Sequence, residues 1–215
     1  MATYTLHPGN NIEVLKQMIQ DGVQVDAVVT DPPYGLKFMG KKWDYDVPSV
    51  EFWTLVLGVL KPGGHVLSFG GTRTDHRMVV NLEDAGFEIR DQIVWLYGSG
   101  FPKSMDVAKA IDKAAGAERE RHHNGRAAGP SDKFAQDEWT KANYNTRLDK
   151  TPITIEAAEW EGWGTALKPA MEPIVLARKP LAEDTVAANV LKYRTGGINV
   201  DGCRVETTDN LNGGA

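Results

Sequence analysis

The feature that most constrains this chain of 215 residues is a short apolar segment that ends at two consecutive prolines. Residues 25–30 (VDAVVT) are mostly apolar and β-branched, which predicts a buried strand. Asp31, Pro32 and Pro33 follow directly. Because proline has no amide hydrogen to donate to a neighbouring strand, pairing cannot continue through two of them. The strand therefore ends at Asp31.

The rest of the chain alternates between helical and strand patterns, with strand signals that end in loops at Gly70 and Gly98. This alternation predicts an α/β fold with a mostly parallel sheet and helices on both faces. Open α/β sheets bind ligands outside the carboxyl ends of their strands, so we expect the loops at Asp31, Gly70 and Gly98 to lie side by side. The expected elements are helices at 12–20, 49–60 (closed by Lys61-Pro62-Gly63-Gly64), 74–84 (capped by Thr74) and 107–115, and strands at 65–69, 87–96 and 173–178.

A polar stretch interrupts this pattern at about residues 116–150, where aliphatic side chains are few. Such a segment inside an α/β pattern is typical of an inserted loop or arm. The expected organisation is a catalytic core at 1–115, an inserted loop or target-recognition arm at 116–165, a return to the core at 166–206 and a disordered tail at 207–215.

Composition excludes several classes of protein. With 24 basic and 29 acidic side chains the formal charge is −5, which excludes a strongly basic chain that binds nucleic acid by charge alone. The single cysteine, Cys203, excludes internal disulfides and a Cys-based zinc site. Adjacent His122 and His123 cannot easily face one metal ion, so no metal site is expected. The absence of a leader pattern and of a long apolar run predicts a cytoplasmic protein with no membrane partner.

Asp31-Pro32-Pro33-Tyr34 resembles the signature of the amino-methyltransferases of DNA, which is Asp/Asn/Ser-Pro-Pro-Tyr/Phe/Trp. The resemblance covers about residues 3–205. Residues 6–15 are similar to the family's segment before the signature, and residues 69–74, 95–104 and 167–173 are similar to a phage and prophage branch. In permuted relatives a later Asp-Pro-Phe-x-Gly-x-Gly segment holds the methionine part of the cofactor, and this sequence contains no such segment.

The resemblance implies a Rossmann-like methyltransferase fold in which that segment is missing. It implies transfer of a methyl group from S-adenosylmethionine to the exocyclic N6 of a flipped adenine in duplex DNA, in restriction-modification or phage methylation in a bacterial or phage-infected cell. Aspartate at position 31 favours adenine over cytosine, whose N4 enzymes more often carry serine there. Two alternatives stay open: a truncated, non-catalytic DNA-binding or partner-binding relic, and half of a split enzyme that a homodimer or a partner chain completes.

The same residues suit this chemistry on physical grounds. An exocyclic amine on a base is a poor nucleophile because its lone pair is delocalised into the ring, and hydrogen-bond acceptors favour the localised form. The Asp31 carboxylate and the Pro32 carbonyl are such acceptors, and Pro33 restricts the backbone between them. Tyr34 can stack on a base swung out of the duplex, which offsets part of the cost of extrusion. The expected catalytic residues are Asp31, Pro32, Pro33 and Tyr34.

The resemblance also implies cofactor contacts at Asn10, Asn11, Asp31 and Gly70. For Asn10 and Asn11 a simpler role as N-caps of the helix at 12–20 is equally compatible with the sequence. Basic side chains near the proposed base pocket, where Trp43 adds an aromatic ring, and in the arm suit phosphate contacts. For the loop near the base pocket, a solvated loop is equally compatible with the sequence. The expected DNA-binding residues are Lys37, Lys41, Lys42, Arg73, Lys103, Arg121 and Arg126.

Overall fold

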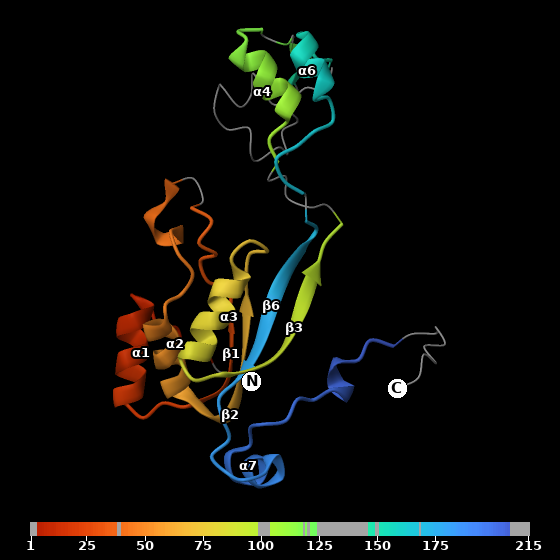
Figure 1. Cartoon of the computed structure of the whole chain (residues 1–215). Helices are drawn as coiled ribbons and strands as arrows, with labels where there is room; N and C mark the ends of the chain where they lie inside the picture. Colours follow the sequence, from red (N-terminus) through yellow and green to blue (C-terminus); the bar gives the residue numbers. More distant parts are fainter. Residues whose placement is uncertain are drawn as a thin grey trace. The chain divides into compact units, whose positions relative to one another are not determined.

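The computed structural model describes residues 4–37, 40–98, 104–117, 119, 121–123, 146–148, 151–167 and 169–206 (Figure 1). No helix in the described ranges is long and apolar enough to cross a membrane.

The chain divides into two compact units, Met1–Gly98 with Met171–Ala215, and Ser99–Ala170. The first unit contains α1 (Asn11–Gln20), β1 (Val25–Thr30), η2 (Lys42–Asp44), α2 (Val50–Val59), β2 (Leu60–Phe69), α3 (Asp75–Asp84), β3 (Glu88–Leu96), β6 (Met171–Arg178), α7 (Val186–Tyr193) and η3 (Asp201–Cys203), and the second contains α4 (Val107–Ala114), β4 (Arg121–His123), β5 (Thr146–Leu148) and α6 (Ile155–Glu159).

The first unit is built on a four-stranded sheet in the order β1-β2-β6-β3. β1 and β2 pair in parallel, whereas β6 runs antiparallel to both of its neighbours. The α/β class expected from the sequence is confirmed, but the sheet is mixed rather than mostly parallel as expected, because β6 pairs antiparallel with β2 and β3. The loops after Asp31 and Gly70 lie on neighbouring strands, but β6 separates them from the Gly98 loop, so the expectation that all three lie side by side is wrong. Between these loops, the amino end of β6 lies at the end of the sheet where β1 and β2 finish.

The hydrophobic core lies between the sheet and helices α1, α2 and α3 (Figure 1). Trp53 of α2 and Leu82 of α3 are fully buried, and Val66 of β2 meets them from the sheet. Burial of such side chains stabilises the fold by about 1.5–3 kcal/mol each. This packing holds β1 and β2 rigidly, so the loop after each strand starts from a defined position.

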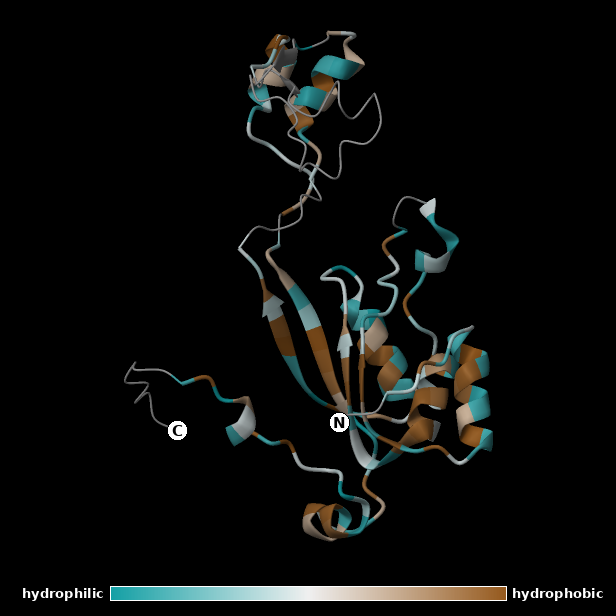
Figure 2. Cartoon of the chain, turned by 180° about the vertical axis from the view of Figure 1, so that it is seen from behind, coloured by the Kyte–Doolittle hydropathy of each residue, from teal (hydrophilic) through white to brown (hydrophobic). Residues whose placement is uncertain are grey.

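The opposite face of the sheet carries apolar side chains that the described helices leave largely uncovered. Val29 is 71% exposed and Trp95 is 57% exposed. The Trp95 ring lies 6.4 Å from that of Phe69, which places both side chains on this face. Apolar stretches are visible along the strands in Figure 2. Helices on both faces were expected, but within the described residues α1, α2 and α3 cover one face.

The start of β2 differs from the expected turn at Lys61-Pro62-Gly63-Gly64. The strand begins at Leu60, and its pairing with β1 shifts between Val25 and Ala27, because residues 61–64 form an irregular section. Gly63 has φ +81°, and a Cβ atom there would lie 2.6 Å from Asn189 Nδ2 of α7. The Asn189 side chain of α7 packs against this irregular section and donates a hydrogen bond to the Pro62 carbonyl at 2.9 Å.

In the second unit, α4 contacts α6. Asp112 of α4 is buried, forms a 2.6 Å ion pair with Arg119 Nε, and accepts hydrogen bonds from the backbone N–H groups of Ile153 and Thr154. Burial alone would raise the pKa of Asp112, but the hydrogen bonds from Thr154 and Arg119 outweigh it and lower that pKa. The sequence assigned α4 to the core at 1–115, whereas these contacts group it with the inserted unit.

Candidate active site

The turn after β1 is held from two sides. One carboxylate oxygen of Asp44, in η2, accepts the backbone N–H groups of Tyr34 and Gly35, both at 2.9 Å. From the other side, Thr74 Oγ1 donates to the Tyr34 carbonyl at 2.5 Å. The sequence predicted that Thr74 caps α3, but its side chain makes no cap hydrogen bond there. It links the loop after β2 to the turn after β1 instead.

Tyr34 and Asp31 are joined by a hydrogen bond: the phenolic hydroxyl donates to Asp31 Oδ1 at 2.8 Å. The Tyr34 ring is half-buried and lies against Gly71, where a Cβ atom would come within 3.2 Å of the ring. Burial raises the pKa of Tyr34, and the carboxylates of Asp31 and Glu172 raise it further. Tyr34 therefore keeps its proton at neutral pH and acts as a hydrogen-bond donor.

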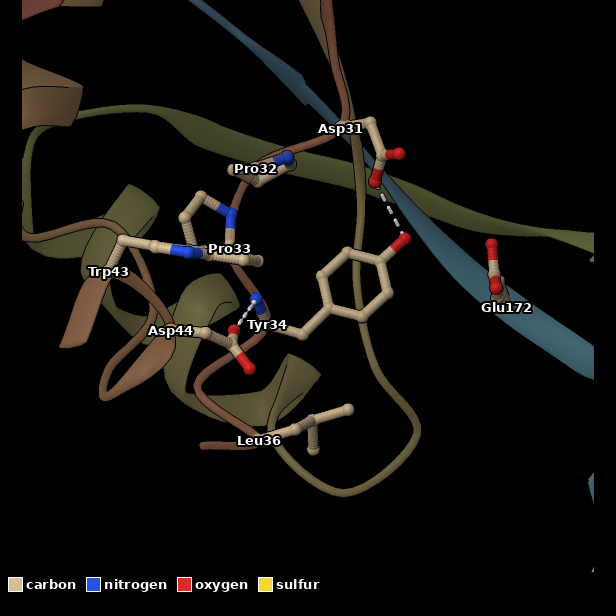
Figure 3. Close-up of a pocket in the computed structure, with 8 residues that line it drawn as sticks. All are labelled: Asp31, Pro32, Pro33, Tyr34, Leu36, Trp43, Asp44 and Glu172. Carbon is tan, nitrogen blue, oxygen red and sulfur yellow. Dashed lines mark hydrogen bonds between the residues drawn. The ribbon is translucent and has the colours of Figure 1, made fainter. Parts of the chain in front are cut away.

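A cavity of about 420 Å³ opens beside this pair (Figure 3). We call it the tyrosine cavity. Its volume lies within the usual range for small-molecule sites, and three carboxylates line it, from Asp31, from Asp44 and from Glu172 of β6. Its lining residues are Asp31, Pro32, Pro33, Tyr34, Leu36, Trp43, Asp44 and Glu172.

A second cavity, of about 400 Å³, is lined in part by the same segment. We call it the asparagine cavity, after Asn11. The two cavities share Asp31, Pro32, Pro33 and Trp43. The lining residues of the asparagine cavity are Asn11, Ile12, Thr30, Asp31, Pro32, Pro33, Trp43, Asp46, Val47, Pro48 and Phe52. Two different ligands can thus meet at Asp31, which is the arrangement that transfer of a group from one molecule to another requires.

The residues expected to contact a cofactor lie in three different settings. Asn11 lines the asparagine cavity with Asp31. Asn10 is the N-cap of α1, and its side chain accepts the N–H of Ile12 at 2.9 Å, so the simpler capping role is confirmed for Asn10. Gly70 lines neither of these two cavities, and a Cβ atom there would lie 2.7 Å from Met78 Cε. Its cofactor contact stays a prediction.

The residues expected to bind DNA are only partly described. Lys37 Nζ lies 5.7 Å from the centre of the Tyr45 ring, and Lys41 and Lys42 occupy the N-cap and the first residue of η2. Arg73 is exposed in the turn before α3. Lys103 and Arg126 lie outside the described residues, and for Arg121 only the backbone, in β4, is described. Their contacts with phosphates stay predictions.

Two residues of the site had no role predicted from the sequence: Asp44 and Glu172. Asp44 lies after the signature, in the loop that the sequence identified by its lysines and by Trp43, the aromatic expected beside the base pocket. Glu172 stands in a segment similar to relatives, but its place at the cavity depends on the antiparallel direction of β6. No local pattern in the sequence reports that direction.

Two adjacent cavities that share an acidic strand end define a two-ligand site in an α/β fold. A family model described as DNA methylase matches residues 25–195. The chain belongs to this family, the N6/N4 DNA methyltransferases.

Individual relatives are similar over part of their length. The Type II methyltransferase M.HindIII of Haemophilus influenzae is 26% identical over 153 residues, which are 70% of this chain and 38% of that protein. The chain thus spans well under half of the curated relative. It is also similar to a crystal structure of M1.HpyAVI (TM-score 0.42, 17% identity, 81% of this chain and 54% of the other) and to one of an M1.HpyAVI-SAM complex (TM-score 0.42, 17% identity, 82% and 54%).

Proposed function

We propose that this chain takes part in methylation of DNA, with S-adenosylmethionine as the methyl donor and the exocyclic N6 of a flipped adenine as the acceptor. Membership of the DNA methylase family supports the reaction class. The observation that carries the proposal is the pair of cavities that share Asp31, Pro32, Pro33 and Trp43. A methyl donor in one cavity and a base in the other would meet at the Asp31 carboxylate.

The asparagine cavity suits S-adenosylmethionine because both polar and apolar side chains line it. Asn11 and Asp46 provide polar groups, while Ile12, Val47 and Phe52 provide apolar surface for an adenosine group. These residues would hold the cofactor on the Asn11 side of Asp31. When bound, the cofactor supplies an electrophilic methyl group.

The tyrosine cavity suits the base. Asp31 accepts a hydrogen bond from the exocyclic amine, which favours the form with a localised lone pair, and its charge stabilises the positive charge that develops on nitrogen. Tyr34 supplies a ring for stacking, worth roughly 1–3 kcal/mol per base, which offsets much of the cost of extrusion from the duplex. Asp44 and Thr74 hold the turn that carries both side chains.

Calorimetric titration with S-adenosylmethionine tests the cofactor assignment. We expect heat of binding in the wild type, and weaker binding in Asn11→Ala and in Asp31→Ala. Asp91→Ala is the matched control, because Asp91 is exposed on β3 and lines neither of the two cavities. Absence of binding in a folded wild-type chain contradicts the assignment for this chain alone.

Incorporation of a labelled methyl group tests the acceptor. Unmethylated duplex DNA of random sequence, RNA and protein are offered in parallel, and we expect label only in DNA. Digestion to nucleosides then separates N6-methyladenine from N4-methylcytosine. Label in cytosine contradicts the inference from Asp31, and label in RNA or protein contradicts the proposed substrate.

A second candidate is half of a split enzyme, and the uncovered sheet favours it. β1 lies at the edge of the sheet, and no Lys or Pro in residues 25–30 protects that edge. Val29 is exposed on the same strand. A second copy or a partner chain could pair with this edge. If so, S-adenosylmethionine binding should rise with protein concentration as dimers form in analytical ultracentrifugation, or appear only after the partner is added.

A further inference from the structure

Glu172 brings a further carboxylate to the tyrosine cavity. It is the second residue of β6 and pairs with Trp95 of β3. Because β6 runs antiparallel to β2, its amino end lies at the sheet edge where β1 and β2 end. Figure 3 shows the Glu172 carboxylate and the Asp31 carboxylate on either side of the Tyr34 hydroxyl.

This arrangement holds one donor between two acceptors. The hydroxyl of Tyr34 has a single proton, which it donates to Asp31 Oδ1 at 2.8 Å. The Glu172 carboxylate lines the same cavity, and burial together with the two carboxylates raises the pKa of Tyr34. Within the described part of the chain, neither carboxylate forms an ion pair with Lys or Arg. The Tyr34 hydroxyl therefore has two carboxylates beside it, of which Asp31 accepts its hydrogen bond.

The hydrogen bond to Asp31 conflicts with the role of that carboxylate in methyl transfer. The oxygen that Tyr34 contacts is one of the two that an incoming amine would use. A half-buried hydroxyl that loses its acceptor without replacement is left unsatisfied, which is unfavourable. Displacement is inexpensive only if another acceptor lies within reach of the same hydroxyl.

We propose that Glu172 is a positioning residue that accepts the Tyr34 hydroxyl when a target amine displaces it from Asp31. The exchange leaves the Asp31 carboxylate to the amine and keeps the tyrosine ring in its place for stacking. The Tyr34 proton stays on its oxygen throughout, and only its acceptor changes. The inference rests on the proposed function, because it assumes an amine as the incoming group.

The Asp31→Leu variant tests the exchange without DNA, cofactor or turnover. Leucine removes the first acceptor and so imitates its loss to an amine. In a crystal structure of this variant we expect the Tyr34 hydroxyl at hydrogen-bond distance from a Glu172 oxygen, with the ring unmoved. A hydroxyl turned to solvent, or a displaced ring, overturns the inference whether or not the chain methylates DNA.

A double-mutant cycle tests the same exchange during methyl transfer. Glu172→Met removes the acceptor at similar length, and we expect kcat/KM for DNA to fall on the order of ten-fold. Glu172→Gln keeps an acceptor oxygen and should restore most of that loss. In the Tyr34→Phe background, Glu172→Met should cause no further loss. Glu83→Met, at an exposed position on α3, controls for the substitution itself.

The cycle separates this role from two others. If Glu172→Gln is as impaired as Glu172→Met, charge rather than hydrogen bonding is what matters, and the inference is wrong. If Glu172→Met costs as much in the Tyr34→Phe background as in the wild type, Glu172 acts on the substrate directly, which also overturns it. A wild type without any methyl transfer contradicts the proposed function, and the Asp31→Leu structure then decides the exchange alone.

Discussion

Asp44 Oδ1 lies 2.9 Å from the backbone nitrogen of Tyr34, and the same oxygen accepts the N–H of Gly35 at 2.9 Å. The Asp44 side chain is only 3% exposed. This contact fixes the backbone of the turn that carries Tyr34 and, through it, the orientation of the ring. The turn is thus positioned by a residue ten places further along the chain, rather than by its prolines alone.

Replacement of Asp44 by alanine should destabilise the protein. Two backbone N–H groups lose a buried acceptor, and we expect the free energy of unfolding to fall by about 2–3 kcal/mol in urea denaturation. Asp44→Asn keeps one acceptor oxygen and should lose less. Equal stability of Asp44→Ala and the wild type would show that the turn does not depend on this contact.

Gly71→Ala should disturb the site more than the fold. Its new Cβ atom would lie 3.2 Å from Tyr34 Cδ2 and 3.3 Å from Tyr34 Cβ, so the ring must shift by a few tenths of an ångström. Because small displacements of groups at a reacting centre are costly, we expect methyl transfer to fall on the order of ten-fold. Gly98→Ala is the control, since a Cβ atom there has nothing within 4 Å. The measurement is the initial rate of labelled methyl transfer, and equal rates for the two variants would contradict the prediction.

Trp43→Ala should weaken binding of both ligands, because Trp43 lines both cavities. We expect reduced affinity for S-adenosylmethionine in calorimetry and for a duplex that carries 2-aminopurine in fluorescence titration. Tyr45→Ala is the matched control, since Tyr45 is a neighbouring exposed aromatic that lines neither of them. If Trp43→Ala weakens binding of only one of the two, S-adenosylmethionine or the duplex, Trp43 contacts a single ligand and the prediction is wrong.

His65 should make stability depend on pH. Burial, followed by the charges of Arg178 and Arg90, lowers the pKa of His65 below its ordinary value of 6.5. As the pH falls through that value, the unfolded chain takes up a proton that the folded chain resists, so the free energy of unfolding decreases. We therefore expect the stability of the wild type relative to His65→Gln to decline from about pH 7.5 to about pH 5.5 in urea denaturation. The control is His76→Gln, because His76 is exposed. If the stability difference between the wild type and His65→Gln stays constant across this pH range, the prediction is wrong.

Much of the local structure was predictable from the sequence. The end of β1 at Asp31 follows from two residues that cannot donate a backbone hydrogen bond, and α2 begins after Ser49, whose side chain caps it. Asn10 likewise caps α1. These features depend on neighbours a few residues away, which is why pattern and residue chemistry are enough to identify them.

The sequence by itself determined the α/β class, the signature from Asp31 to Tyr34 and its position at the end of a strand. Only the tertiary structure decided that Asp44 accepts hydrogen bonds from the turn, that Glu172 lines the same cavity as Asp31, and that Trp43, expected beside the base pocket, lines both cavities. The physical reason is strand order. β6 inserts antiparallel between β2 and β3, a pairing of segments far apart in the chain whose direction no local periodicity records.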